Sequence, residues 1–352
     1  MSNATIDDVA RVAGVSTKTV SRVVNREPNV RQSTQAKVEK AIAELKYRPN
    51  QFARNLASHR SHLIGLIYDD PSAYEVPSAG YVMRLQQGTL RACRASNYEL
   101  LIHPCRYRSK DVVAELEALI RHIRPTGIIL AAPLSNMPRI VEAIEASGTP
   151  LVRLSPGRDD EKQFSVVTND REICAEMTRY LASLGHRRIA FIKGHRQHKA
   201  VGNRYLGYMD GLRECDLEPS GELVQQGDNS LGAGEECARR LLQLDEPPTA
   251  IFAANDDMAA GVLRVAAKMG VDVPGQLSVA GCDDISLARQ IHPTLTTIRQ
   301  PLAAMAEAAT LALVDGSRKD PPRRGTAVVP GQLRIRESTG AAPSRALSSG
   351  GT

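Results

Sequence analysis

The sequence contains no tryptophan, no pair of cysteines in Cys-x-x-Cys spacing, and no apolar run near the roughly 18 residues that span a bilayer. The lack of such a run excludes membrane insertion. Residues 1–10 include two acidic residues and no basic, apolar leader, so we expect no secretory signal. The six cysteines are scattered, which predicts reduced thiols in a cytoplasmic protein rather than a disulfide framework or a zinc site.

The usual sequence signatures of enzymes are also missing. Gly232–Gly234 follows no clear strand and lacks the third glycine of a dinucleotide-binding loop, and no Walker loop or Gly-x-Ser-x-Gly motif occurs. His195 and His198 are three residues apart, but no third metal ligand follows them. We therefore expect no catalytic residue, no cofactor and no metal ion.

The excess positive charge lies in the first part of the chain. Residues 1–60 contain eleven Lys or Arg and five Asp or Glu, whereas residues 61–352 contain thirty-four of each. The length of 352 residues suggests two or three compact units. A basic segment before a neutral remainder fits a polyanion-binding module joined to a domain with another task. A basic surface that is merely solvated is the alternative.

The basic segment has the pattern of a helix-turn-helix. Thr5 and Asp8 have the spacing of a capping box, and Gly14 supplies a turn between two short amphipathic stretches. A helix, a short glycine-containing turn and a second helix make up this motif. The expected helices cover about residues 6–13, 17–25 and 33–46.

The second expected helix presents a polar face to DNA. Its N-terminal part would reach base edges in the major groove. Arg22 can donate two hydrogen bonds to O6 and N7 of guanine, and Thr17 and Lys18 are placed to read neighbouring base pairs. A polar face that only meets water is the structural alternative. Phosphate contacts are expected from three further polar residues: Ser16, Ser21 and Asn25.

The runs Thr5–Ser16 and Thr19–Asn25 resemble the headpiece of the LacI (lactose repressor) family of bacterial transcription regulators. The resemblance covers about residues 4–337. It implies a homodimeric repressor that binds a pseudo-palindromic operator and responds to a small-molecule effector. Further segments follow in the family's order: Lys37–Leu45, Tyr47–Asn50, Gly185–Ile192, Asn203–Arg204, Ala254–Asp256, Gly281–Asp284 and Leu295–Ile298.

A short linker follows the headpiece. Residues 50–58 contain good helix formers after a capping Asn50. They make only two helical turns, which is shorter than the ~12 to 15 residues at which an isolated helix reaches even marginal stability. The resemblance implies a hinge helix that binds DNA through Asn50 and Leu56, with Leu56 inserted between base steps in the minor groove. The alternative makes Leu56 and Phe52 anchors onto the following domain.

After residue 60, short apolar strands alternate with helices, which predicts parallel sheets covered on both faces. The segment is longer than one sheet usually holds, so we expect two lobes. The resemblance implies an α/β two-lobed, periplasmic-binding-protein-like effector domain, with crossovers near residues 161, 290 and 320. The full expected order is an all-α helix-turn-helix headpiece (1–48), a hinge helix (49–60), the effector-binding and dimerisation domain (61–337) and a disordered tail without heptads (338–352).

Polar residues just after strand ends predict a ligand site between the lobes. A buried carboxylate and a guanidinium suit a hydroxyl-rich ligand, which needs directed donors and acceptors. The family carries effector contacts at the positions of Arg204, Asn255 and Asp283. Helix capping or bridging of the lobes is the structural alternative for each residue. The five candidates are Asp69, Ser155, Arg204, Asn255 and Asp283.

One segment departs from the family pattern. In Gly227–Ser230, Asn229 stands where an aromatic residue commonly stacks on the ligand. The apolar face of a sugar or base would then rest on another group, with Tyr74, Tyr81 and Phe191 as candidates. We expect a saccharide effector acting on a cytoplasmic, nucleoid-associated repressor. The alternative is a corepressor-dependent regulator that responds to a nucleobase or other metabolite, and a solute-binding protein or an enzyme is less favoured.

Overall fold

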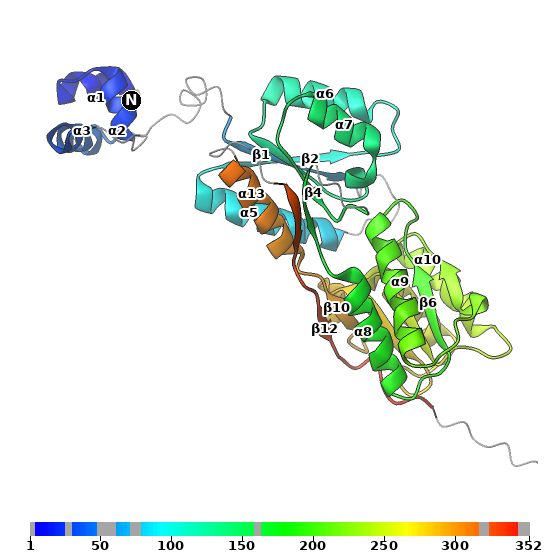
Figure 1. Ribbon diagram of the computed structural model, residues 1–352. Coiled ribbons are helices and arrows are strands. Elements are labelled where there is room, and N and C mark those ends of the chain that lie inside the picture. The colour runs from blue at the N-terminus through cyan, green and yellow to red at the C-terminus, as the bar shows by residue number, and fades with distance from the viewer. Residues whose placement is uncertain are drawn as a thin grey trace, which may run out of the picture. The chain divides into compact units, whose positions relative to one another are not determined.

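The computed structural model describes residues 4–24, 30–47, 61–70, 79–157, 163–316 and 324–343. The chain divides into two compact units, Met1–Ser61 and His62–Thr352, called here the headpiece and the body (Figure 1). The hinge predicted at 49–60, with Asn50 and Leu56, lies outside the described residues, as does Asn25. Among the residues described, no helix combines the length and apolar character that a membrane span requires.

The headpiece has the three predicted helices. Thr5 and Asp8 form the predicted capping box, in which the Thr5 backbone nitrogen donates to the Asp8 carboxylate at 2.9 Å. Gly14 ends the first helix in a left-handed conformation (φ 65°), which a residue without Cβ adopts easily. The helices are α1 (Ile6–Ala13), α2 (Thr17–Val24) and α3 (Gln32–Glu44). Their shared core consists of Val9, Ala10, Val20, Val23, Val38 and Ala41.

The first lobe of the body is a six-stranded parallel sheet in the order β11-β5-β4-β3-β1-β2. Two helices, α6 and α7, cover one face, and α5 and α13 cover the other (Figure 1). Because both faces are covered, β3 and β4 are buried along their whole length. The sequence of β3 is a continuous apolar run, whereas β4 contains the buried Arg153. The strands are β1 (Leu63–Asp69), β2 (Glu99–Cys105), β3 (Gly127–Leu130), β4 (Leu151–Leu154), β5 (Phe164–Val167) and β11 (Gly325–Val328). The helices are α5 (Ala79–Ser96), α6 (Val112–Ile123), η2 (Leu134–Asn136), α7 (Pro138–Ala146) and α13 (Leu302–Gly316).

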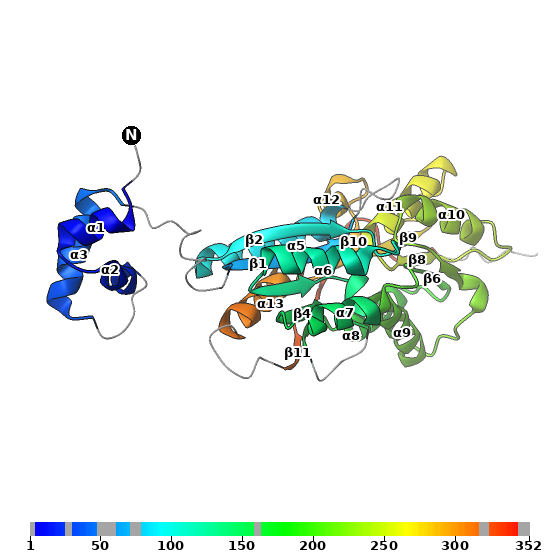
Figure 2. The ribbon, with the colours of Figure 1, turned by 90° about the horizontal axis from the view of Figure 1, so that it is seen from above.

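The second lobe has a sheet in the order β12-β10-β9-β8-β6-β7, parallel except for β12. Helix α8 packs against α9 and α10 against α11, on opposite faces of the sheet (Figure 2). Figure 2 also shows the carboxyl end of β2 pointing toward this lobe. The strands are β6 (Ile189–Lys193), β7 (Val224–Gln226), β8 (Ala250–Ala253), β9 (Ser278–Asp283), β10 (Thr296–Arg299) and β12 (Gln332–Arg334). The helices are α8 (Asp170–Ser183), α9 (Lys199–Glu214), η3 (Gly221–Leu223), α10 (Leu231–Leu242), α11 (Asp256–Lys268) and α12 (Leu287–Gln290).

The chain passes between the lobes three times, each time later than predicted. The crossovers lie between β5 and α8, between β10 and α13, and between β11 and β12. The predictions near residues 161, 290 and 320 each fall before a strand that still belongs to the sheet the chain is leaving. The positions implied by the resemblance therefore all err in the same direction, by one strand.

The predicted disordered tail begins too early. Residues 338–343 are ordered against the second lobe, with Ser338 fully buried. The Ser338 hydroxyl accepts a hydrogen bond from the Thr296 backbone nitrogen at 2.8 Å and donates to the Val279 carbonyl at 2.6 Å. The segment has few apolar residues, so its composition indicated disorder. It is held by hydrogen bonds of its hydroxyl groups instead of by apolar packing.

Candidate DNA-binding surface and interlobe site

Helix α2 turns a basic face away from the headpiece core. Val20 and Val23 are buried in that core, so the opposite face points outward. The helix contains no acidic residue, and an electropositive face of this kind attracts phosphate. Three predicted base-contacting side chains are exposed on it: Thr17, Lys18 and Arg22.

Ser16 begins α2 as its N-cap, as predicted. Its hydroxyl accepts a hydrogen bond from the Thr19 backbone nitrogen at 3.2 Å, and the two hydroxyl oxygens are 2.9 Å apart. A helix N-terminus favours negative charge, so the phosphate contact predicted for Ser16 is compatible with capping. That contact and the one predicted for the half-buried Ser21 stay predictions.

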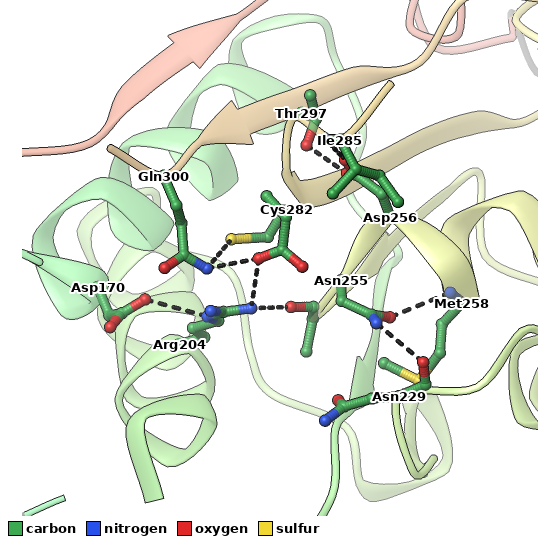
Figure 3. A network of polar contacts seen from close by, with 12 residues as sticks. Asp170, Arg204, Asn229, Asn255, Asp256, Met258, Cys282, Ile285, Thr297 and Gln300 are labelled. Carbon is green, nitrogen blue, oxygen red and sulfur yellow. Dashed lines mark hydrogen bonds and ion pairs between the residues drawn. The ribbon is translucent and has the colours of Figure 1, made fainter. Parts of the chain in front are cut away.

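Arg204 is the centre of a buried polar network in the second lobe (Figure 3). Its side chain extends from α9 and is 4% exposed. Its Nε donates to Oδ1 of Asp170 at 3.0 Å, and its Nη1 lies 3.5 Å from Oδ1 of Asp283. Nη1 also donates to the carbonyl of Ala254. The network thus joins the start of α8 to the carboxyl ends of β8 and β9.

Asp283 combines a carboxyl group of raised pKa with a strained backbone. Burial raises its pKa to about 7, because loss of water penalises the charged carboxylate more than Arg204 stabilises it. The amide of Gln300 donates to its carboxylate. Its backbone has φ 126°, a left-handed region that residues with a Cβ rarely adopt. Strained backbone and a perturbed carboxyl group in one residue indicate a functional site.

Asn255 has the capping role that the sequence left open as an alternative. Its Oδ1 accepts from the Met258 backbone nitrogen at 3.0 Å, and its Nδ2 donates to the Asn229 carbonyl at 2.9 Å (Figure 3). Asn229 itself adopts φ 75°, and its Oδ1 accepts from the His195 backbone nitrogen at 3.2 Å. The residue in place of the stacking aromatic therefore braces the loop after β6.

The first lobe reaches this region through aromatic side chains. Tyr107 Oη lies 3.2 Å from Nε2 of His195 in the second lobe, and Arg108 Nη2 lies 3.0 Å from the same nitrogen. The rings of Tyr81 and His198 meet edge to face at 6.2 Å. Within the described part of the chain, the buried Tyr81 hydroxyl has no hydrogen-bond partner. Burial, and then the Asp283 charge, raise the Tyr81 pKa, so this hydroxyl stays protonated.

The other two candidates lie on the first lobe. Asp69 ends β1, and its Oδ1 accepts from the Tyr107 backbone nitrogen at 3.5 Å. Ser155 follows β4, is buried, and has φ 48°. The structure brings Arg204 and Asp283 into contact in the second lobe and places Asp69 and Ser155 at the carboxyl edge of the other sheet.

Phe191 is not placed to stack on a ligand, so the prediction that it supports the apolar face of the effector is wrong. Its ring is fully buried in the core of the second lobe and stacks on Tyr208 at 4.9 Å between centroids. Three residues near the site were missed: Asp170, Gln300 and Tyr107. Asp170 and Gln300 closely follow β5 and β10, so the rule that polar residues after strand ends line the site would have found both.

A helix-turn-helix headpiece joined to a two-lobed body with a buried polar site defines the class of ligand-controlled transcription regulators. A family model described as bacterial regulatory proteins, lacI family, matches residues 5–50, and one described as periplasmic binding protein-like domain matches residues 178–339. The HTH-type transcriptional regulator GalR of Escherichia coli (strain K12) is 33% identical over 312 residues, covering 88% of each chain.

Solved structures agree with these relatives. The lac repressor dimer bound to operator and the anti-inducer ONPF matches with a TM-score of 0.76 and 27% identity, covering 97% of this chain and 100% of that chain. A complex of the transcriptional regulator CelR with cellobiose matches with a TM-score of 0.74 and 28% identity, covering 95% and 99%. The chain belongs to the LacI family of bacterial regulatory proteins. It is a DNA-binding transcription regulator and not an enzyme, which confirms the predicted family and fold class.

Proposed function

We propose that this protein is a repressor that binds a pseudo-palindromic operator as a homodimer and is controlled by a saccharide held between its lobes. The observation that carries the proposal is the presence, in one chain, of an exposed basic helix face and a buried carboxylate–guanidinium site. The helix face supplies DNA recognition, and the buried site supplies a means of sensing. Two heads that read a twofold operator need a twofold protein. Such a repressor acts in the cytoplasm, at the nucleoid.

The polar groups of the site suit sugar hydroxyls. A hydroxyl both donates and accepts hydrogen bonds. Arg204 offers donors, the carboxyl group of Asp283 offers acceptors, and the amide of Asn255 offers both. The buried Tyr81 hydroxyl offers a further contact, and its ring is the apolar surface that we propose in place of an aromatic at position 229. Asp69 and Ser155 would complete the contacts from the first lobe. The solved relative that carries cellobiose supports this class of ligand.

The DNA contacts follow from the same family relationship. We place base contacts at Thr17, Lys18 and Arg22, and a minor-groove wedge at Leu56. Phosphate contacts come from the remaining predicted residues: Ser16, Ser21, Asn25 and Asn50. An effector can change operator affinity only by binding two lobe arrangements with different strength, so the sensing site and the DNA contacts are separable by mutation.

The experiment first identifies a ligand by thermal shift with mono- and disaccharides and with nucleobases. Fluorescence anisotropy of a labelled operator then compares wild type with Asp283→Asn and with Asp210→Asn. Asp210 is the control because it lies in α9 like Arg204 but pairs with Arg171 outside the buried network. We expect Asp283→Asn to keep the operator affinity of the unliganded protein and to weaken the saccharide effect at least tenfold. The control should respond like wild type.

Two outcomes would change the assignment. A normal saccharide response in Asp283→Asn would mean that the effector binds elsewhere. A nucleobase that tightens operator binding, with no effect of any sugar, would support the corepressor alternative.

A further inference from the structure

A cluster of potential metal ligands lies on the first lobe, apart from the Arg204 network. His103 and Cys105 are two residues apart on β2, so both side chains point to the same face of the sheet. Helix α6 covers that face and contributes Glu115. One ligand atom from each residue lies within 4.8 Å of the other two, and Nε2 of His103 is 2.8 Å from Oε1 of Glu115.

The cluster is buried at one end and open at the other. Cys105 is 1% exposed to solvent, whereas the side chains of His103 and Glu115 are 22% and 44% exposed. A sulfur fixed in the core with an imidazole and a carboxylate at the surface leaves an entry path for an ion and room for a water ligand. β2 is the edge strand of its sheet as far as the described residues show, and none of them adds a strand beside it.

The surroundings favour a cation. The carboxylates of Glu115, Asp69 and Asp70 all lie near enough to Cys105 to attract a cation bound beside it.

The donor set selects the kind of metal. Magnesium and calcium prefer oxygen ligands alone, whereas one imidazole, one thiolate and one carboxylate suit Zn²⁺. Zinc sites with three protein ligands keep a fourth, open position for water. Tetrahedral ligands lie about 3.3 to 3.8 Å apart, so the 2.8 Å His103–Glu115 pair must open slightly and the longer distances in the cluster must shorten by up to about 1 Å. The exposed Glu115 and the partly exposed His103 have room to adjust.

We propose that His103, Cys105 and Glu115 form a binding site for Zn²⁺. The site rests on these side chains alone and is independent of the function proposed above. It also revises the expectation of a chain without metal. The sequence did not reveal it because the ligands come from a strand and the following helix, in a spacing unlike the short Cys and His pairs typical of zinc motifs.

The test uses the full chain with any affinity tag removed and metals stripped with a chelator. Zinc is titrated in competition with a chromophoric chelator, and Co²⁺ is added separately to record absorption. The variants are His103→Gln, Cys105→Ser and Glu115→Gln. The controls are Cys93→Ser, a buried cysteine of the same lobe, and His122→Gln, a histidine of the same helix whose ring contacts the Ala118 carbonyl.

We expect one zinc ion whose affinity falls at least tenfold in each cluster variant and stays unchanged in both controls. Co²⁺ should give a thiolate charge-transfer band in wild type that disappears in Cys105→Ser. Equal zinc affinity in wild type and Glu115→Gln, or no zinc binding by wild type, would overturn the proposal and leave an ordinary His–Glu pair. Circular dichroism checks folding, and Glu115→Gln, on an exposed helix surface, decides the question even where Cys105→Ser fails to fold.

Discussion

Replacing Asp283 with asparagine should change how the stability of the body depends on pH. Asparagine has nearly the same shape and can still accept hydrogen bonds from Gln300 and Arg204, but it cannot ionise. In the folded protein Asp283 has a pKa of about 7, against an ordinary value of 3.8. Between about pH 4 and 7 the folded state therefore keeps a proton that the unfolded chain releases.

The magnitude follows from the size of this shift. A group with a raised pKa in the folded state stabilises the protein fully below its ordinary pKa, and this contribution is lost as pH rises through the folded value. A shift of about 3 units at 1.36 kcal/mol per unit gives about 4 kcal/mol. Relative to wild type, Asp283→Asn should gain about 4 kcal/mol in free energy of unfolding from pH 4 to pH 8.

Urea unfolding followed by far-ultraviolet circular dichroism suits the measurement, since the chain has no tryptophan to report fluorescence. Asp210→Asn is the control with the opposite sign. Hydrogen bonding from Arg171 lowers the Asp210 pKa, so its contribution is present above the ordinary pKa and is lost as pH falls. A difference between wild type and Asp283→Asn that does not vary with pH would refute the reasoning and give Asp283 an ordinary pKa.

Three further predictions concern other parts of the chain. Arg22→Ala should weaken operator binding by about 1 to 3 kcal/mol per half-site, and equal weakening on random DNA would show that Arg22 contacts only the backbone. Leu56→Ala should reduce DNA bending and operator affinity while leaving non-specific affinity unchanged; unaltered energy transfer across a doubly labelled operator would exclude the wedge. Arg204→Met should cost about 3 to 5 kcal/mol of stability at pH 7, because Asp170 and Asp283 stay buried without their cation; a loss below 1 kcal/mol in urea unfolding would contradict this.

Local signals predicted the headpiece well. The capping box at Thr5, the turn at Gly14 and the inward valines of α2 all depend on residues within one or two turns of each other. Apolar runs likewise predicted several strands of the body, among them β1, β3, β6 and β8, because parallel strands covered on both faces are largely apolar.

The site could be predicted only in part. Arg204, Asn255 and Asp283 follow strand ends or match the family pattern, but most of their partners are distant in sequence. Arg204 and Asp170, for example, are 34 residues apart. The contact of Tyr107 with His195 joins different lobes and has no local signal. Phe191 was misjudged because the sequence does not show whether an aromatic side chain on a strand points into the core or toward a ligand site. Only the packing of the folded lobe decides this.

The three crossovers have a consequence for the order in which the protein can be made. Helix α13 fills much of one face of the first lobe, with Met305, Ala309 and Leu313 all buried there, yet it follows every strand of the second lobe except β12. During synthesis on the ribosome, the core of the first lobe therefore stays incomplete until residue 316 has emerged. The headpiece precedes all of this and needs none of it, so a nascent chain can present a folded DNA-binding module long before it has a complete domain to regulate it.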